Sequence, residues 1–268
     1  MSQRDNYIGV FDSGIGGLTV ARSIIQKMPN ENIIYFGDTA HLPYGTKSDK
    51  QIRQFVMDDV HFLEQFDIKA LVIACNTADS VARKTVQEHF TDLPIFGVIK
   101  PASKRAAGMT KNNRIGIMAT PATVRTGAYV EKIHKYNPQA EVFQLACPLL
   151  VPLVENSRYK AEDPVVKIVL NEYLDQLREK DVDTIVLGCT HYPLLEEAVR
   201  TFVPEMTVIS SSEAAAQTLL EGLQDQDLDR KEGTARYRYY VSDDPEHFTD
   251  NARIFMGDDF TGKAELHV

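Results

Sequence analysis

The strongest fold signal in the chain is Leu71-Val72-Ile73-Ala74-Cys75-Asn76-Thr77. Its apolar residues predict a buried strand over Ala70–Ala74, and the polar residues after them predict a turn into a helix. The same pattern returns as Ile185-Val186-Leu187-Gly188-Cys189-Thr190-His191, where we expect a strand over Thr184–Leu187. Each copy therefore places one cysteine at the carboxyl end of a predicted strand.

Two further pairs of segments match in the same order along the chain. Residues 8–13 (Ile-Gly-Val-Phe-Asp-Ser) correspond to residues 115–120 (Ile-Gly-Ile-Met-Ala-Thr), and residues 62–66 correspond to residues 173–177. The three offsets are 107, 111 and 114 residues, so the spacing between the copies is nearly constant. Three matches in order predict a duplicated α/β unit.

Short β-branched runs alternate with amphipathic stretches along most of the chain. A capping box formed by Ser48 and Gln51 opens one of the amphipathic helices. The alternation predicts an α/β fold of two pseudo-symmetric domains, each a mostly parallel sheet flanked by helices, with the active site in the cleft between them. The other predicted strands are Tyr7–Phe11, Asn32–Gly37, Ile95–Ile99, Arg114–Met118 and Val142–Ala146, and the other predicted helices are Leu18–Lys27, Val81–Phe90, Thr123–Tyr136 and Val165–Leu177.

The residues after about Ser210 have no counterpart in the first copy of the repeat. They predict a helix over Glu213–Leu223, a charged turn over Asp225–Glu232 and a strand over Arg236–Val241. We expect this segment to pack back onto the first half. The expected domains are therefore residues 1–98 together with 211–268, and residues 99–210.

Composition excludes several classes of function. The 268 residues are 43% hydrophobic and 25% charged, which is ordinary for a globular protein that buries a core. No apolar run approaches the ~18 residues of a membrane span, and the first residues lack a signal peptide, so we expect a cytoplasmic protein. A net charge of -9 without a basic block argues against nucleic-acid binding. Three widely spaced cysteines, an odd number, indicate reduced thiols.

Cys75 and Cys189 indicate the chemistry, because each follows an apolar strand and precedes a predicted helix. Open α/β sheets bind ligands at the carboxyl ends of their strands, and a helix N-terminus offers free N–H groups to a carboxylate. If the two repeats face each other, the cysteines meet across one cleft. Inversion of a carbon centre needs that arrangement, since one thiolate removes a proton from one face while a thiol delivers a proton to the other.

The α-proton of an amino acid is weakly acidic, and no lysine or phosphate-binding loop indicates a pyridoxal cofactor. A site without cofactor has to stabilise the carbanion by hydrogen bonds to the α-carboxylate and by excluding water. Asp12 and His191 are placed to adjust the protonation of one cysteine each. The polar groups at turns beside the predicted strand ends are Asp12, Ser13, Tyr44, Gly45, Asn76, Thr77, Thr190 and His191.

The cysteines also allow other interpretations. A free cysteine at a strand end is most often a small buried hydrophobe, which is our interpretation of Cys147. Cys75, Cys189 and His191 could together hold zinc, although a Cys-x-His pair is closer than common zinc spacings. We therefore expect no metal site, and keep zinc as an alternative.

Three further features have a less specific meaning. The glycines of residues 14–17 are typical of nucleotide-binding loops, but Thr19 stands where G-x-G-x-x-G needs its third glycine. Glu155, in an expected loop, is a weak candidate for an additional acid or base. The histidines interpreted as surface or packing residues are His41, His61, His89, His134, His247 and His267.

Five motifs follow one another over about residues 7–220, which is most of the chain. They are residues 12–20 (Asp-Ser-Gly-Ile-Gly-Gly-Leu-Thr-Val), 36–39 (Phe-Gly-Asp-Thr), 43–45 (Pro-Tyr-Gly), 74–78 (Ala-Cys-Asn-Thr-Ala) and 187–193 (Leu-Gly-Cys-Thr-His-Tyr-Pro). Together these motifs resemble the bacterial glutamate racemases. The resemblance implies interconversion of L-glutamate and D-glutamate without cofactor or metal, which supplies D-glutamate for peptidoglycan, and a substrate held between two pseudo-symmetric domains.

The resemblance also implies roles for single residues. In that family the residues matching Cys75 and Cys189 form the catalytic acid/base pair, those matching Asp12 and His191 assist them, and the match to Glu155 has a supporting role in some members. His41-Leu42 departs from the family, where many members carry a basic residue, and Asp79 stands where a small residue is usual. The implied substrate contacts are Asp12, Ser13, Tyr44, Gly45, Asn76, Thr77, Thr190 and His191.

A glutamate racemase is therefore the first hypothesis for the function. A racemase of aspartate or another acid is the close enzymatic alternative. A thiol redox or zinc-binding protein would form a Cys75–Cys189 disulfide or bind a metal, and a protein-binding role has no direct support in the sequence. We expect a homodimer, because symmetric pairs are the commonest oligomers.

Overall fold

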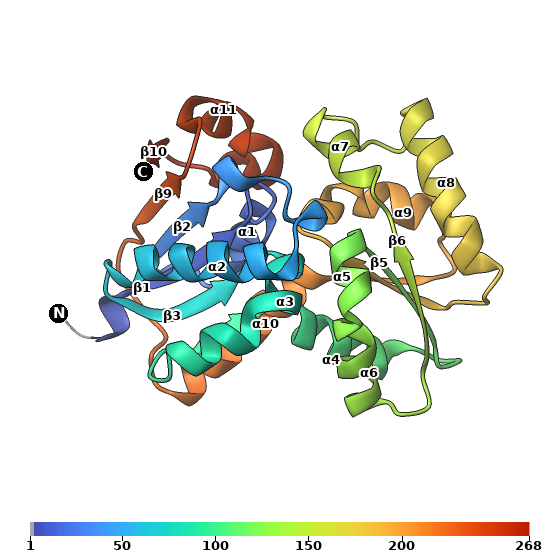
Figure 1. Cartoon of the computed structure of the whole chain (residues 1–268), viewed down its shortest axis with the longest axis horizontal. Helices are drawn as coiled ribbons and strands as arrows, with labels where there is room; N and C mark the ends of the chain where they lie inside the picture. The colour runs from blue at the N-terminus through green and yellow to red at the C-terminus, as the bar shows by residue number, and fades with distance from the viewer. Residues whose placement is uncertain (1–2, 268) are drawn as a thin grey trace.

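Two parallel β-sheets form the framework of the molecule (Figure 1). The computed structural model describes residues 3–267. The strands are β1 (Tyr7–Asp12), β2 (Ile33–Gly37), β3 (Ile68–Ile73), β4 (Ile95–Gly97), β5 (Arg114–Ala119), β6 (Glu141–Ala146), β7 (Thr184–Gly188), β8 (Thr207–Ser210), β9 (Tyr237–Val241) and β10 (Ala264–Leu266). The larger sheet has the order β10-β9-β2-β1-β3-β4 and the smaller has the order β6-β5-β7-β8, with neighbouring strands parallel throughout.

Both sheets contain the same four-strand pattern, because β2-β1-β3-β4 of the larger sheet reappears as β6-β5-β7-β8. The matched segments of the sequence lie on equivalent strands, β1 with β5 and β3 with β7. β9 and β10 extend the larger sheet beyond β2, with Tyr239 opposite Tyr35, so the C-terminal segment does pack back onto the first half. This strand membership agrees with domain limits at 98/99 and 210/211, and the limits themselves stay a prediction.

Helices flank both sheets, which confirms the predicted fold class. They are α1 (Leu18–Lys27), α2 (Asp49–Glu64), α3 (Asn76–His89), α4 (Ile99–Met109), α5 (Pro121–Thr126), α6 (Ala128–Tyr136), α7 (Leu150–Glu155), α8 (Pro164–Arg178), α9 (Glu196–Phe202), α10 (Ser211–Asp225) and α11 (Pro245–Met256). The capping box predicted from Ser48 and Gln51 is present at the start of α2.

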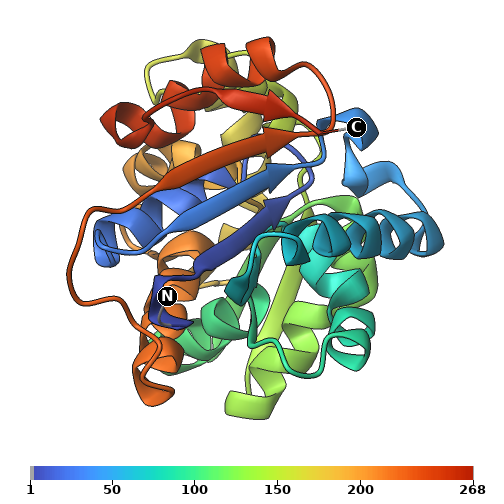
Figure 2. The same ribbon diagram turned by 90° about the vertical axis from the view of Figure 1, so that its left-hand side faces the viewer.

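The larger sheet lies between two layers of helices (Figure 2). Successive residues of a strand point to opposite faces, and β3 follows this rule. Ala70 and Val72 join the core that contains α1 and α10, whereas Leu71 and Ile73 join the core that contains α2 and α3. All of these strand residues are buried, as expected for a parallel sheet covered on both sides.

α4 and α10 connect the two halves of the molecule. α10 packs against α1 of the first half and against α4, and α4 also contacts α6 and β7 of the second half. One apolar core continues through this seam, since it contains Ala102 of α4, Leu219 of α10 and Ile185 of β7. No helix within residues 3–267 has the length and apolar character of a membrane span.

Two helices near the cleft differ from the sequence prediction. α3 begins at Asn76 and not at Val81, so that Cys75 is its N-cap residue. The first turn of α3 is polar and therefore lacks the apolar spacing that identifies a helix. The helix predicted over Thr123–Tyr136 is divided into α5 and α6 at Gly127, whose φ of 65° is left-handed and favours glycine.

The loop predicted after β6 is wrong, because residues Leu150–Glu155 form α7. Pro152 lies in the first turn of this helix, where a missing N–H breaks no hydrogen bond of the helix. The strand predicted over Ile95–Ile99 ends at Gly97, because the N–H of Ile99 already opens α4 and donates to Oδ2 of Asp79 at 2.9 Å. The helices and strands absent from the prediction are α4, α7, α11, β8 and β10, and α9 is the helix expected after Cys189, for which no bounds were predicted.

Candidate active site

Cys75 lies where β3 ends and α3 begins. Its thiol is 5% exposed, donates to Oγ of Ser13 at 3.5 Å and accepts from the N–H of Ala78 at 3.5 Å. Burial, followed by the negative charge of Asp12, raises the pKa of Cys75 to about 12. The thiol at this end of the site is therefore neutral at physiological pH.

Cys189 lies at the equivalent place after β7, and it is 6% exposed. Its sulfur is 3.9 Å from Nδ1 of His191, and Nε2 of the same ring is 3.1 Å from Oε1 of Glu155 at the end of α7. Burial alone lowers the pKa of His191, but its hydrogen bonds to Cys189 and Glu155 outweigh burial and raise the pKa to about 10. An imidazolium cation therefore stands beside the sulfur of Cys189.

Asp12 connects the two ends of the site. The residue ends β1 and is fully buried, with Oδ2 accepting from the N–H of Gly14 at 3.1 Å. Oδ1 accepts a long hydrogen bond of 3.4 Å from Oγ1 of Thr190, which follows Cys189. Burial raises the pKa of Asp12, and the positive charge of His191 partly offsets that rise. A carboxyl group from one half thus faces both a thiol of its own half and the second half.

The glycines after Asp12 allow this contact between the halves. A Cβ atom on Gly16 would lie 2.5 Å from Nδ1 of His191 and 2.5 Å from Oγ1 of Thr190, and one on Gly17 would lie 2.3 Å from Cβ of Asp12. These separations are too short for any side chain. The glycine-rich loop is thus required by packing against residues 190–191, with no nucleotide needed to explain it.

Asn76 and Thr77, which follow Cys75, make similar contacts with residues of the second half. Oγ1 of Thr77 lies 3.0 Å from Oγ1 of Thr120 and 3.3 Å from Oγ1 of Thr123 in the second half. The hydroxyl of Tyr129 donates to Oδ1 of Asn76 at 2.6 Å, while the buried Nδ2 of Asn76 has no hydrogen-bond partner among residues 3–267. A buried donor without a partner at the edge of a site fits an acceptor on a ligand.

Tyr44 and Gly45 contribute to the site in different ways. The hydroxyl of Tyr44 is buried and donates to Oδ2 of Asp38 at 2.6 Å, so it is already engaged within the protein. A Cβ atom on Gly45 would lie 3.4 Å from Cβ of Thr120, which places the main chain of this loop against the second half.

The structure thus brings the predicted site residues together where the two halves meet, in two linked groups. One contains Asp12, Ser13, Cys75, Asn76 and Thr77, and the other contains Cys189, Thr190, His191 and Glu155, with Tyr44 and Gly45 beside Thr120. Sequence reasoning missed Thr120, Thr123 and Tyr129. The repeat contained a signal for the first of these, because Thr120 is the counterpart of Ser13.

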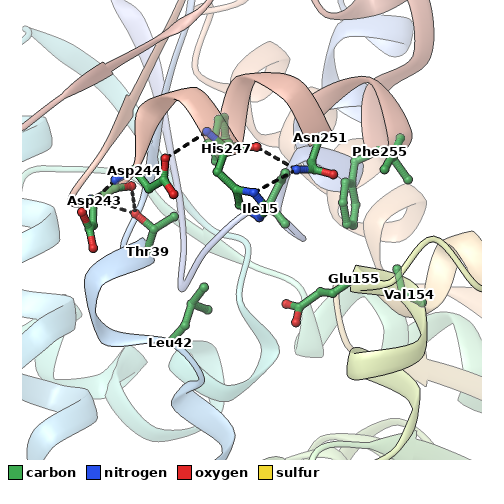
Figure 3. Close-up of a pocket in the computed structure, with 12 residues that line it drawn as sticks. Ile15, Thr39, Leu42, Val154, Glu155, Asp243, Asp244, His247, Asn251 and Phe255 are labelled. Carbon is green, nitrogen blue, oxygen red and sulfur yellow. Dashed lines mark hydrogen bonds between the residues drawn. The ribbon is translucent and has the colours of Figure 1, made fainter.

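A cavity of about 310 Å³ adjoins this site at Glu155 (Figure 3). Ile15, Leu42 and residues of α11, including His247 and Phe255, line it, and Glu155 faces it from the opposite side. The ring of Phe255 also meets the ring of His191 edge-on, with 5.6 Å between centroids. Neither cysteine is among the lining residues, so the cavity lies next to the reactive groups and does not contain them.

The thiols are free in the structure. Cys75, Cys147 and Cys189 form no disulfide. Among residues 3–267, no group of three or more His, Cys, Asp and Glu side chains is arranged to hold a metal ion. The geometry therefore gives the zinc and disulfide alternatives no support.

Comparison with known proteins assigns the family. Residues 8–219 match the Asp/Glu/Hydantoin racemase family. Glutamate racemase from Neisseria meningitidis is 44% identical over 259 residues, covering 95% of this chain and 94% of the relative. The crystal structure of glutamate racemase isoform RacE1 from Bacillus anthracis has a TM-score of 0.93 at 35% identity, covering 99% of this chain and 98% of that one.

A second solved structure carries a ligand. Glutamate racemase from Francisella tularensis, solved in complex with D-glutamate, has a TM-score of 0.91 at 36% identity, and the alignment covers 99% of this chain and 98% of that one. Sequence match, identity and fold thus agree over nearly the whole length. The chain belongs to the Asp/Glu/Hydantoin racemase family.

Proposed function

We propose that the chain is a glutamate racemase, which interconverts L-glutamate and D-glutamate without cofactor and supplies D-glutamate for peptidoglycan. Support comes from the relatives named above, one of which was solved with D-glutamate. The observation that carries the proposal is the pair Cys75 and Cys189. They follow equivalent strands of two sheets with the same strand order, beside one shared set of polar groups.

Proton transfer runs between the two sulfurs. The thiolate of Cys189 removes the α-proton from one face of the substrate, and the C–H electron pair passes into the carbanion and its α-carboxylate. The thiol of Cys75 then donates its proton to the opposite face, which leaves Cys75 as thiolate and Cys189 as thiol. The opposite enantiomer reacts through the same steps in reverse order.

The surroundings of the two cysteines favour the state from which the reaction starts, with Cys189 as thiolate and Cys75 as thiol. The imidazolium of His191 stabilises negative charge on the sulfur of Cys189, and Glu155 keeps that imidazole protonated. The thiol of Cys75 is buried next to Asp12 and holds its proton. Asp12, His191 and Glu155 are thus assisting residues, and Cys75 and Cys189 are the catalytic ones.

Substrate binding falls to the polar groups around the sulfurs. We assign the α-carboxylate and amine to Asp12, Ser13, Asn76, Thr77, Thr190 and His191, with the unpartnered Nδ2 of Asn76 as one donor. The start of α3 adds backbone N–H groups that favour a carboxylate. Tyr44 and Gly45 contribute through their main chain, because the Tyr44 hydroxyl is engaged elsewhere. A dense set of donors in a water-poor site stabilises the carbanion.

We also propose that the protein works in the cytoplasm as a homodimer. The mechanism needs free thiols, which persist in reducing compartments. Symmetric pairs are the commonest assembly of soluble proteins. Size-exclusion chromatography with light scattering checks the second point, since it measures the mass of the particle directly.

A racemisation assay on protein freed of metals and cofactors tests the function. We expect the optical activity of L-glutamate and of D-glutamate to decay to zero. The addition of EDTA should leave the rate of this decay unchanged. Aspartate and other amino acids serve as the comparison, and glutamate should have the highest kcat/KM. A preference for aspartate would assign a different substrate, and absence of racemisation of any acid would overturn the proposal.

A further inference from the structure

A cluster of acidic side chains lies behind the loop that carries Tyr44 and Gly45. The hydroxyl of Tyr44 is 2.6 Å from Oδ2 of Asp38 and 3.1 Å from Oδ2 of Asp59. Asp38 is 1% exposed and Asp59 is 4% exposed, so water does not stabilise either group. The racemase mechanism uses neither carboxyl, although Asp38 belongs to one of the motifs in the sequence.

Separate segments of the fold meet at this cluster. Asp38 follows β2, and Asp59 lies on α2. Ser242, which follows β9, donates its hydroxyl to Oδ1 of Asp38 at 2.8 Å, and Nδ1 of His41 lies 2.8 Å from the same oxygen. The cluster therefore fixes the loop of Tyr44 to the larger sheet, its C-terminal extension and the helix above it.

The cluster also touches the proposed active site. The N–H of Asp38 donates to the carbonyl oxygen of Asp12 at 3.0 Å. Burial, and after it the acidic groups Asp59 and Asp38, raises the pKa of the Tyr44 hydroxyl, and Cys75 lies close enough to add to that rise. A change in the cluster is therefore transmitted over a short distance to the groups around the substrate.

A count of protons defines the state of the cluster. The hydroxyl of Tyr44 has one proton, and it donates that proton over the shorter distance to Asp38. Its oxygen can then accept one hydrogen bond, and Asp59 is the residue that faces it. An ionised Asp59 has no proton to donate. The two carboxylates would then share a single hydrogen-bond donor, the hydroxyl of Tyr44. A protonated Asp59 completes a chain from Asp59 through Tyr44 to Asp38.

The surrounding charges favour this proton. Burial, and after it the charge of Asp38, raises the pKa of Asp59. The hydrogen bond to Tyr44 lowers this pKa and the charges of Asp58 and Asp12 raise it, and the net shift is well upward. The titratable groups around the cluster are Asp12 on β1, His41 beside Asp38, Asp58 on α2 and Cys75 before α3. His41 is the one base in this set, and its side chain is 46% exposed.

We propose that the hydrogen-bonded chain Asp59–Tyr44–Asp38 is a positioning device for substrate binding, which holds the main chain of Tyr44 and Gly45 toward the substrate. The inference rests on the proposed function for the identity of the substrate. Asp38 and Asp59 act through Tyr44 and touch no reacting atom, so they are positioning residues. Loss of the proton of Asp59 breaks the chain, and glutamate binding weakens as the pH rises through that ionisation.

Substitutions of Asp59 separate this role from simple packing. Asp59→Asn keeps a donor to Tyr44 and cannot ionise, whereas Asp59→Leu fills similar space without a donor. We expect Asp59→Leu and Tyr44→Phe to raise KM about tenfold with kcat changed by less than about twofold. Asp59→Asn should keep KM within about twofold of the parent and lose the rise of KM at alkaline pH. Asp58→Asn, next in sequence and exposed, is the matched control: it should leave KM at neutral pH unchanged and move the alkaline rise of KM slightly to lower pH, because Asp58 adds to the pKa of Asp59.

Hydrogen–deuterium exchange gives a readout that needs no substrate. The amides of Leu42 and of residues 44–47 should exchange about tenfold faster in Asp59→Leu and Tyr44→Phe than in the parent, and at the parent rate in Asp59→Asn. Unchanged exchange in Asp59→Leu would overturn the inference, as would an Asp59→Asn variant that keeps the alkaline rise of KM. If the parent protein fails to racemise glutamate, the proposed function fails by itself, and exchange alone decides whether the chain positions the loop.

Discussion

The two ends of the site have the same origin in the fold but different electrostatics. Cys75 and Cys189 follow equivalent strands in sheets of the same order. Cys75 is next to Ser13 and the carboxyl of Asp12, which leaves it a neutral thiol. Cys189 is next to an imidazolium held by Glu155. Duplication thus supplies the position of two thiols, and divergence of their neighbours gives them different electrostatic surroundings, as the proposed pair of one acid and one base requires.

The largest expected effect comes from replacing either cysteine of the pair Cys75 and Cys189. Cys75→Ala and Cys189→Ala should each lower kcat for racemisation by about 10³-fold or more, because one face of the substrate loses its proton carrier. Cys147→Ala is the matched control, since Cys147 is buried outside the two groups and should leave the rate within about twofold. A single mutant of Cys75 or Cys189 with full activity would refute the two-thiol mechanism.

A smaller loss of activity should follow when the loop at Gly16 is pushed away from residues 190–191. Gly16→Ala places a methyl group about 2.5 Å from His191 and Thr190, and we expect kcat/KM to fall about 10²-fold because the reacting groups shift. Gly108→Ala on α4 meets nothing within 4 Å, and should leave activity unchanged. A crystal structure or NMR spectra of the variant should show that the loop around residue 16 is displaced. A fully active Gly16→Ala protein would show that this contact is not needed.

The contrast between the ends can be sharpened at Glu155. In Glu155→Gln, the amide oxygen can still accept from Nε2 of His191, but the ring loses the negative charge that helps to raise its pKa to about 10 in the parent. The imidazolium should then deprotonate at lower pH, so the alkaline limb of kcat should move to lower pH. The fall at neutral pH should be about tenfold, and unequal for the L and D substrates. An unmoved pH profile would mean that Glu155 has no part in the charge of His191.

The smallest of these effects on activity is expected from loss of the hydrogen bond between Tyr129 and Asn76. Tyr129→Phe removes the hydroxyl that donates to Oδ1 of Asn76 at 2.6 Å, and a lost hydrogen bond of this kind is worth ~1 kcal/mol. We expect KM for glutamate to rise about fivefold with kcat nearly constant. Initial rates over a range of glutamate concentrations measure both constants, and a change confined to kcat would contradict a binding role for Asn76.

Local patterns were sufficient to predict the framework of the fold and the position of Cys75 and Cys189 at the ends of equivalent strands. The apolar runs before Cys75 and Cys189 and the Ser48–Gln51 capping box correspond to β3, β7 and the start of α2. The turns at the predicted strand ends supplied the polar residues beside them, and the family resemblance added the roles of these residues. These features are encoded within a few neighbouring residues, which is the distance over which sequence patterns are informative.

Contacts between distant segments could not be predicted in the same way. Glu155 reaches His191 only because α7 forms where a Pro-containing segment predicted a loop. Asp38 and Asp59 meet at Tyr44 from two separate elements. Asp38 lies in a motif that gave no indication of this contact, and Asp59 has no local signal beyond being an acidic residue. The sequence likewise could not show that the hydroxyl of Tyr44 is engaged within the protein, because its partner Asp38 is brought to it by the fold.

Racemisation in deuterium oxide tests the assignment of one base to each face most directly. A thiol carries a single proton, so the cysteine that removes the α-proton returns the same proton if the reaction reverses before exchange. The two-thiol mechanism predicts that the first product molecules carry deuterium at the α-carbon while the remaining substrate keeps protium, as measured by chiral chromatography with mass spectrometry. Product that retains the original hydrogen would contradict it, because a single group would then have served both faces.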